Sequence, residues 1–332
     1  MKYTLLLAAL CVSLQALSQR NRFKNPRFLE TDKSVVDTKS VSQVLQEPLQ
    51  IVPTNPAPAP VAHSTQGYHP LKVTTPDVPK QFTLFGEKMP LEQWDVRERL
   101  DRELLVNNYM HGSTSYIIKL MYRWMPMIEA RLKANGVPDD FKYLCVAESA
   151  LQNQISKAGA VGFWQFMKGT APSFGLYIDE EVDERYNPEK STDAACAYLK
   201  QAYAKFGNWT SAAASYNCGM GGLNAAMTAQ GESSYYNLWL FDETMRYVFR
   251  IAALKLILSS PEKYGFHLSD DDVYFPHNVK RVTVNSGVGD LISYAKSKGT
   301  NYKTLKMLNP WLREKHLHNS KGRSYTILLP AN

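Results

Sequence analysis

Glu148 is the residue of this chain whose position points most directly to chemistry. Phe141, Leu144 and Cys145 are spaced at i, i+3 and i+4 on one helix face, and Glu148 takes the next position on that face. A carboxylate on a buried face must be paired, or its pKa rises and it keeps its proton. A lone glutamate at a helix end usually reaches solvent or a cation instead, so the segment that follows has to decide between these interpretations.

That segment combines glycines with aromatic rings and one amide: Gly159 and Gly162, then Phe163, Trp164, Gln165 and Phe166. Exposed aromatic rings beside an amide are typical of a sugar-binding cleft, because ring faces stack on a pyranose and the amide contacts an N-acetyl or hydroxyl group. An apolar wall near Glu148 would also raise its pKa, as a general acid needs at neutral pH. The pattern therefore indicates acid catalysis on a carbohydrate.

Four motifs stand in order along the chain: Glu148-Ser149, Gly-Phe-Trp-Gln at 162–165, Ser-Tyr-Asn-Cys-Gly at 215–219 and Glu-Thr-Met-Arg-Tyr-Val at 243–248. Together they resemble the motifs of the lytic transglycosylases of glycoside hydrolase family 23. Any one of them is weak, whereas four in order are specific. The resemblance covers about residues 82–265 and implies a mainly α fold with a lysozyme-like, helical SLT domain.

The resemblance implies cleavage of the peptidoglycan glycan strand between N-acetylmuramic acid and N-acetylglucosamine. Glu148 would protonate the glycosidic oxygen and then act as base on the muramic C6 hydroxyl, which closes a 1,6-anhydro ring without water. No second catalytic carboxylate is needed, unlike in the common two-carboxylate scheme. No cofactor or metal is implied. The motif positions imply that further residues bind and orient sugar, with the tyrosine hydroxyls beside Glu148: Ser149, Trp164, Gln165, Tyr216, Asn217 and Tyr247.

Two other functions stay open on the sequence. A hydrolytic muramidase on the same fold would activate water through a second carboxylate, for which Asp183 and Glu184 are the candidates. A non-catalytic wall-binding protein would carry an inactive cleft, and the intact Glu148-Ser149 pair argues against it. A denatured zymogram separates this last alternative from an enzyme.

The cysteines do not predict a catalytic nucleophile. Cys11 lies in the expected leader, which leaves Cys145, Cys196 and Cys218, an odd number that forms at most one internal disulfide. Cys145 precedes Glu148 by one turn and Cys218 follows Asn217, so both are expected near the site. No histidine of the catalytic segment stands in a recognisable arrangement with them.

A metal site is not expected either, because His316 and His318 are too close together and too isolated in the sequence.

The formal net charge is +7, or +6 once Lys2 leaves with the leader. A modest basic surplus suits an anionic cell wall, and no basic run indicates a nucleic-acid-binding arm. Glycan strands are therefore the expected partner, and the oligomeric state is not predicted.

Helices are expected to position the site. Periodicity and end signals predict them over 94–107, 113–135 with Pro126 as a kink, 138–149, from Asn187-Pro188 to Gly207, 209–216 and 244–259. The helix over 138–149 is expected to begin at Pro138, with Asp139 and Asp140 opposing the positive end of its dipole. The helix over 209–216 should end in a glycine cluster that aims Tyr216 and Asn217 into a cleft.

The C-terminal part changes in character at about residue 277. A strand at 282–284, helices at 290–297 and 300–308 and a closing strand at 325–329 give a β-α-α-β order. This order resembles a LysM module over 279–330, although its usual Gly-Asp-Thr appears here as Gly287-Val-Gly289-Asp290. The change in composition predicts a small α+β unit that folds independently and binds peptidoglycan.

The N-terminal part predicts export. Residues 1–18 have a positive start, an apolar run too short to span a bilayer and small residues at 16 and 18, so a signal peptide cleaved before Gln19 is expected. A lipoprotein at Cys11 is the alternative, which the bulky Leu10 disfavours. Residues 19–81 are polar and Pro-rich and predict a disordered tether. The mature chain is expected to have no transmembrane segment and to work in the periplasm or cell envelope.

Overall fold

The computed structural model describes residues 74–331, so the expected signal peptide and most of the expected tether lie outside the described residues. The fold is mainly helical, with little strand, as the sequence predicts. The elements of residues 74–278, called here the larger part, are β1 (Thr83–Leu84), β2 (Glu87–Lys88), α3 (Trp94–Asn108), α4 (His111–Ala134), α5 (Phe141–Ser149), η2 (Ala171–Phe174), η3 (Glu184–Tyr186), α6 (Pro188–Phe206), α7 (Trp209–Gln230), η4 (Tyr235–Asn237), α8 (Asp242–Ser259), η5 (Pro261–Tyr264) and η6 (Asp270–Asp272).

The C-terminal part contains β3 (Val279–Val284), α9 (Leu291–Ser297), α10 (Tyr302–Leu308) and β4 (Tyr325–Pro330), which confirms the expected β-α-α-β order. The two strands are antiparallel, with Val282 opposite Ile327. Asp290 and Asn301 cap the two helices through side-chain oxygens that accept backbone N–H groups.

Local end signals set most of the helix bounds correctly. The Asn187 side-chain oxygen accepts hydrogen bonds from the backbone N–H groups of Glu189 and Lys190, at 3.1 and 3.2 Å, and Pro188 takes the first helical position of α6. Gly207 ends the helix at φ +73°. Helix α4 starts two residues earlier than expected and continues through Pro126.

Helix α5 differs from its expected start. It begins at Phe141 and not at Pro138, because residues 138–140 form a turn in which the Phe141 N–H donates to the Pro138 carbonyl at 3.1 Å. The Asp140 carboxylate accepts hydrogen bonds from the Phe85 N–H, at 2.6 Å, and from Lys255 Nζ, at 2.7 Å. Asp140 therefore ties the β1–β2 hairpin and α8 to the start of α5, a long-range role that the spacing did not indicate.

The glycine cluster breaks α7 but does not end it. Gly219 has φ +78° and ψ 147°, a conformation that side chains with a Cβ avoid, and the chain then returns to helical conformation up to Gln230. The expected interruption after Tyr216 and Asn217 is confirmed, whereas the second helical segment was not predicted.

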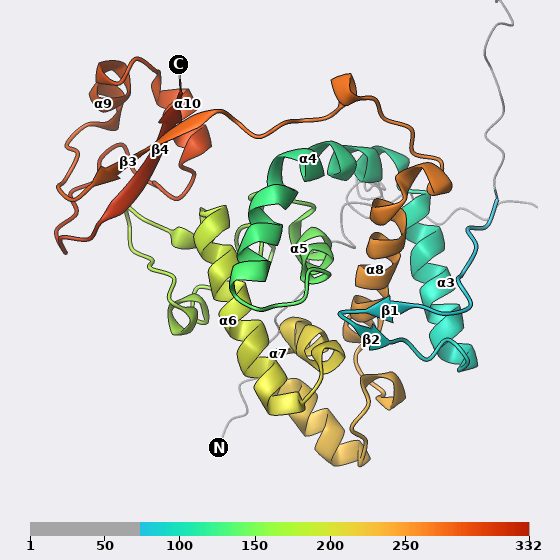
Figure 1. The fold of residues 1–332 in the computed structure, drawn as a ribbon. Coiled ribbons are helices and arrows are strands. Elements are labelled where there is room, and N and C mark those ends of the chain that lie inside the picture. The colour runs from blue at the N-terminus through green and yellow to red at the C-terminus, as the bar shows by residue number, and fades with distance from the viewer. Residues whose placement is uncertain (1–73, 332) are drawn as a thin grey trace, which may run out of the picture. The chain divides into compact units, whose positions relative to one another are not determined.

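Helix α5 lies in the middle of the larger part, surrounded by α4, α6, α7 and α8 (Figure 1). Helix α8 packs against α3, α5 and α7, and α6 packs against α7 and α4. Ala212, Ala213 and Ala214 of α7 are fully buried, and their small side chains let neighbouring helices approach closely. This packing brings the end of α5 against the middle of α8.

The C-terminal module does not have a separate core. Its buried residues, such as Leu305 and Ile327, form one cluster with Val161, Val182 and Tyr186 of the larger part. Val182 forms a β-bridge with Leu312. The composition change near residue 277 therefore does not mark an independent core, and the domain boundaries drawn from it remain predictions.

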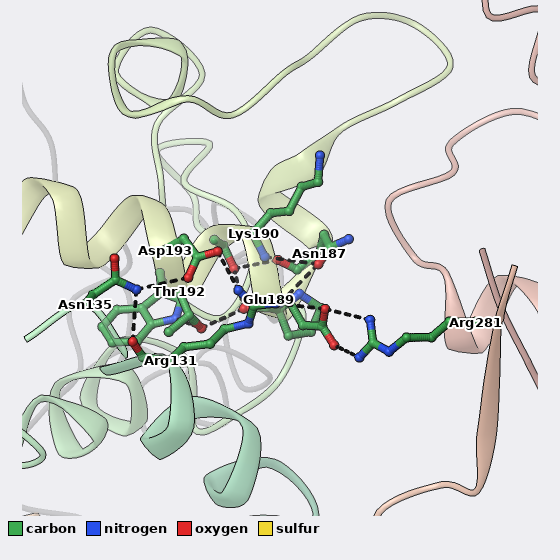
Figure 2. A network of polar contacts seen from close by, with 11 residues as sticks. Arg131, Asn135, Asn187, Glu189, Lys190, Thr192, Asp193 and Arg281 are labelled. Carbon is green, nitrogen blue, oxygen red and sulfur yellow. Dashed lines mark hydrogen bonds and ion pairs between the residues drawn. The ribbon is translucent and has the colours of Figure 1, made fainter. Parts of the chain in front are cut away.

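A polar network joins the two parts as well. Arg131 of α4 contacts Asp193 and Glu189 of α6, with 3.0 Å between Arg131 Nη2 and Glu189 Oε2 (Figure 2). Glu189 also binds Arg281 of β3, with 3.0 Å between Oε2 and Nη1. Asn135 donates a further hydrogen bond to Asp193.

Within residues 74–331, no helix combines the length and the apolar character needed to cross a membrane.

Candidate functional site

Glu148 is the next-to-last residue of α5, directly before the point where the chain turns away. Ala150 ends the helix in the left-handed conformation at φ +52°. Glu148 is half-buried, and its Oε1 accepts a hydrogen bond from the hydroxyl of Tyr247 on α8. The expected contact between Glu148 and a tyrosine is therefore present, and the packing of α5 on α8 creates it across 99 positions of sequence.

Burial raises the pKa of Glu148 from 4.5 to about 7. The hydrogen bond from Tyr247 and the positive charge of Arg250 lower this pKa, and the negative charge of Glu243 raises it. Desolvation dominates because it penalises the ionised form. Burial also raises the pKa of Tyr247 well above its ordinary value, so Tyr247 stays a proton donor to the carboxylate. Near neutral pH, Glu148 therefore exchanges a proton readily.

Arg250 belongs to a charged cluster that lies between α3 and α8. Glu103 is 1% exposed and contacts Arg102 at 2.7 Å, Arg246 at 2.6 Å and Arg250 at 3.8 Å. Its Oε2 atom has no hydrogen-bond partner among the described residues. Arg250 is the member of this cluster whose positive charge acts on Glu148.

A cavity of about 600 Å³ adjoins this cluster. Its lining includes the residues on either side of Glu148, Ala147 and Ser149, together with Gln154 and Arg250, but not Glu148 itself. A volume of this size is in the range of ligand sites. The cavity thus offers room for a sugar beside the end of α5.

Gln165 lies on the loop that follows α5 and has an unusual backbone, with φ +48°. Its Nε2 donates to the carbonyl oxygens of Gly162, at 2.8 Å, and Gln154, at 3.2 Å. Its Oε1 is buried without a hydrogen-bond partner among the described residues. A strained residue with a fixed, unsatisfied acceptor is a feature of binding sites. This acceptor suits an N–H group such as that of an N-acetyl substituent.

Tyr216 and Asn217 lie on α7 just before its break. The Tyr216 hydroxyl donates to the backbone carbonyl of Trp164 at 2.8 Å and not to Glu148. The charge of Glu148 still adds to the effect of burial, and together they raise the pKa of Tyr216 well above its ordinary value. Asn217 Oδ1 accepts a hydrogen bond from the Thr244 hydroxyl at 2.7 Å.

Ser149 is buried, and its hydroxyl donates to the Cys145 carbonyl at 3.3 Å, one turn back in α5. In this position Ser149 lines the cavity, but its hydroxyl proton is engaged in a hydrogen bond within α5. Its expected contact with sugar remains a prediction.

The expectation of exposed aromatic rings is wrong. Trp164 is 0% exposed, and its Nε1 donates to the Thr192 hydroxyl at 2.9 Å inside the core. Phe163 and Phe166 are also buried. Trp164 therefore cannot stack on a sugar, because the loop folds inward and its rings join the hydrophobic core. The rings make the apolar surroundings of α5 without forming a binding platform.

Asp183 and Glu184, the candidate water-activating carboxylates, are both buried in other contacts. Asp183 pairs with Arg185, with 2.7 Å between Oδ2 and Nη2, and Glu184 accepts hydrogen bonds from the Tyr177 N–H and from Lys190. Tyr177 and Arg185 belong to the segment that contacts the C-terminal module, and Lys190 lies on α6. Neither carboxylate contributes to the electrostatics of Glu148.

The three cysteines among the described residues are free thiols. Cys145 is fully buried, its Sγ donates to the Phe163 carbonyl, and burial raises its pKa well above the ordinary value. A buried thiol with a raised pKa is a poor nucleophile. Cys145 therefore contributes packing below Glu148.

Sequence reasoning named Tyr247 of α8 as a site residue but gave no role to Glu243 or Arg250. Glu243, Tyr247 and Arg250 are spaced at i, i+4 and i+7, which places them on one face of the helix toward α5. Burial raises the pKa of Glu243, while Arg250 and a hydrogen bond from Asn217 lower it. The polar residues at 243, 247 and 250 of an otherwise largely apolar helix were the signal from which Glu243 and Arg250 could have been found.

Comparison with known proteins identifies both parts of the chain. A family model described as "Transglycosylase SLT domain" matches residues 125–239, and one described as "Soluble lytic transglycosylase C-terminal LysM-like domain" matches residues 280–332. Glu148 and Gln165 lie inside the first match, whereas Tyr247 lies just beyond it.

Two relatives are similar over parts of the chain. Membrane-bound lytic murein transglycosylase D of Escherichia coli (strain K12) is 29% identical over 248 residues, which are 73% of this chain and 53% of that protein. Peptidoglycan transglycosylase gp16 of Escherichia phage T7 is 34% identical over 110 residues, 32% of this chain and 8% of that protein. The chain thus spans about half the length of the first relative.

A solved structure of an inactive mutant of the lytic transglycosylase Slt from Pseudomonas aeruginosa is also similar, at 23% identity and a TM-score of 0.34. The similarity covers 46% of this chain and 26% of that one.

Proposed function

We propose that this chain, which carries a transglycosylase SLT domain and a C-terminal LysM-like domain, is a lytic transglycosylase that cleaves the glycan strand of peptidoglycan. The observation that carries the proposal is the carboxyl group of Glu148, whose pKa burial raises to about 7. At neutral pH such a group gives a proton in one step and accepts one in the next. One residue is then sufficient for both proton transfers.

The reaction joins an intramolecular oxygen to the carbon that the leaving group vacates. Glu148 donates its proton to the glycosidic oxygen, and the bond between that oxygen and C1 of N-acetylmuramic acid breaks. The N-acetyl group of the same sugar stabilises the positive charge at C1. The Glu148 carboxylate then takes the proton of the C6 hydroxyl as its oxygen bonds to C1, which yields the 1,6-anhydro end and returns the protonated acid.

The neighbours of Glu148 support this assignment. The hydroxyl of Tyr247 stabilises the carboxylate between the two proton transfers. The unsatisfied Oε1 of Gln165 is proposed to accept the N–H of an N-acetyl group, and the cavity beside Ser149 is proposed to hold a sugar. Asn217, placed by its hydrogen bond with Thr244, is proposed to orient the adjoining sugar.

Product analysis tests the reaction. Digestion of purified peptidoglycan should release muropeptides whose muramic ends are one water lighter than hydrolytic ends and resist borohydride reduction, because an anhydro end has no free aldehyde. Mass spectrometry before and after borohydride treatment measures both properties. A digest of the same material with a hydrolytic muramidase is the control, because its muramic ends are reducible. Reducible muramic ends as the main product would assign the chain to the hydrolytic alternative, with Glu243 as the second carboxylate to examine.

Replacing Tyr247 by phenylalanine is expected to shift the pH dependence of cleavage. The Tyr247 hydrogen bond lowers the pKa of Glu148, so its removal should raise that pKa. The protonated acid then persists to higher pH, and the high-pH limb of the kcat/KM profile should shift to higher pH. Initial rates between pH 5 and 9 measure the shift. Tyr203→Phe is the matched control, because Tyr203 is partly exposed and stacks on Trp209 away from Glu148. An unchanged profile would remove Tyr247 from the reaction.

Such an enzyme must act outside the cytoplasm, where peptidoglycan lies, and we propose that residues 1–18 direct its export. Amino-terminal sequencing of the exported protein should then find Gln19 first, whereas a lipid on Cys11 would contradict this.

A further inference from the structure

Three side chains of types that commonly bind metals lie close together where the larger part, residues 74–278, contacts the C-terminal module. Glu181 comes from the loop before η3, and His316 and His318 come from the segment between α10 and β4. Their possible ligand atoms all lie within 4.8 Å of one another. His316 Nε2 lies 3.4 Å from Glu181 Oε1, and His318 Nδ1 is hydrogen-bonded to the same oxygen.

The backbone places both histidines on one side. Leu317 pairs with Val288 through two backbone hydrogen bonds, of 2.9 and 2.6 Å, so residues 316–318 are extended. Side chains alternate along an extended segment, so His316 and His318 project to the same face while Leu317 points into the core and is 1% exposed. The sequence spacing that seemed too short for a metal site is therefore the spacing that puts two imidazoles side by side.

Glu181 is held in place from three directions. Its N–H donates to Asp179 at 2.9 Å, and its carbonyl accepts the Arg313 N–H at 2.7 Å. Its Oε2 accepts the backbone N–H of His318 at 2.8 Å, which leaves Oε1 facing the two imidazoles. The carboxylate is thus oriented before any ion arrives, so binding orders little further structure.

We propose that Glu181, His316 and His318 form a zinc site. Two imidazoles and one carboxylate are a ligand set that zinc accepts, with a fourth position for water. Ligand atoms about 2.0–2.1 Å from a tetrahedral zinc lie about 3.4 Å apart, close to the separation of Glu181 and His316. His318 is 66% exposed on its side chain, so an ion can enter from solvent. Zinc binding replaces the hydrogen bond between His318 Nδ1 and Glu181 Oε1.

The site joins the two matched regions of the chain. Glu181 lies within residues 125–239, and both histidines lie within residues 280–332. An ion here adds a coordination clamp to the Glu189–Arg281 ion pair and to the shared hydrophobic cluster (Figure 2). This role goes beyond the proposed glycan cleavage, since none of the three residues contacts Glu148.

Calorimetric titration of the chelator-treated full chain with ZnCl₂ tests the site. One saturable zinc ion is expected, and His316→Ala or His318→Ala should each weaken binding by at least about 100-fold, because each removes a ligand from a site that has three. Glu181→Gln should also weaken it. His267→Ala and His277→Ala are matched controls at exposed positions outside the cluster and should bind zinc as the wild type does.

Cobalt substitution and thermal unfolding give readouts that do not depend on a single variant. Cobalt bound to the wild type should show the intense visible absorption of a tetrahedral ion, and zinc should raise the unfolding temperature of the wild type but not of the His316→Ala/His318→Ala double variant. The absence of saturable zinc binding in the wild type would overturn the proposal. Equal binding by the double variant would also overturn it, since the ion would then sit elsewhere in the chain.

Discussion

Replacing Glu148 by glutamine is expected to lower the rate of glycan cleavage by about two to four orders of magnitude, the usual range for a general acid–base residue. Glutamine keeps the shape of the side chain and can still accept the Tyr247 hydrogen bond. It cannot deliver a proton to the glycosidic oxygen or remove one from the C6 hydroxyl. Both transfers are assigned to the same group, so no intact neighbour is expected to restore the rate.

Initial rates on purified peptidoglycan and on short soluble glycans measure this loss. Glu98→Gln is the matched control, because Glu98 is exposed on α3, and it should cleave at the wild-type rate. Glu243→Gln separates the two reactions: it should change the rate by less than about tenfold in a transglycosylase, but abolish cleavage if Glu243 activates water. Binding to insoluble peptidoglycan should survive in Glu148→Gln. Full activity in Glu148→Gln would remove Glu148 from the chemistry altogether.

The free energy of unfolding of Glu148→Gln tests whether its loss of activity comes from unfolding. The Glu148 pKa rises from 4.5 to about 7 on folding, so between these values the folded protein holds a proton that the unfolded chain releases. Stability from this group is complete below pH 4.5 and is lost as the pH rises through 7. Glutamine does not titrate. At pH 8, Glu148→Gln should therefore be more stable than the wild type, by up to about 3 kcal/mol, in urea unfolding.

Replacing Gly162 by alanine is expected to lower the free energy of unfolding by about 2–6 kcal/mol, as a disfavoured backbone conformation and an overpacked contact coincide. Gly162 has φ +84°, and a Cβ added there would lie 2.1 Å from the carbonyl oxygen of Arg185. Backbone cannot move aside as a flexible side chain can. The Arg185 guanidinium in turn donates to the Phe166 carbonyl at 3.1 Å, so the loop that carries Gln165 is built around this contact.

Urea unfolding of Gly162→Ala beside Gly169→Ala measures the effect. Gly169 has no positive φ, and a Cβ there would meet no heavy atom within 4 Å, so its substitution should change stability by less than about 0.5 kcal/mol. Cleavage by any folded Gly162→Ala protein should also fall, because Gln165 Nε2 donates to the Gly162 carbonyl. Equal stability of the two variants would show that the loop shifts freely around Arg185.

Local signals in the sequence determined much of the backbone. Asn187 and Pro188 predicted the start of α6, and Gly207 predicted its end, because caps act within a single turn. The bounds of the C-terminal strands and helices were recovered within a few residues for the same reason. The start of α5 was misplaced by three residues, because residues 138–140 form a turn. The contacts of Asp140 with Phe85 and Lys255 were not predicted, because both residues lie far away in the sequence.

The sequence also identified Glu148 as the residue to examine, because an ionisable side chain interrupts a helical apolar stripe that can be counted without a structure. It could not supply the pKa of that residue. Desolvation by the surrounding helices raises it, and Tyr247 and Arg250 oppose the rise from α8. These contributions exist only after α5 packs against α8.

Tertiary packing alone decided which way the side chains point and which residues they contact. An aromatic run reads the same whether its rings face solvent or the core, and only the inward fold of the loop buried Trp164. Asp183 could be paired with Arg185 or free to activate water, and two histidines could be isolated or joined by Glu181. A partner across more than a hundred residues, as in the last case, is chosen by how elements pack, because hydrogen bonds and charges act over a few ångströms of space and not along the chain.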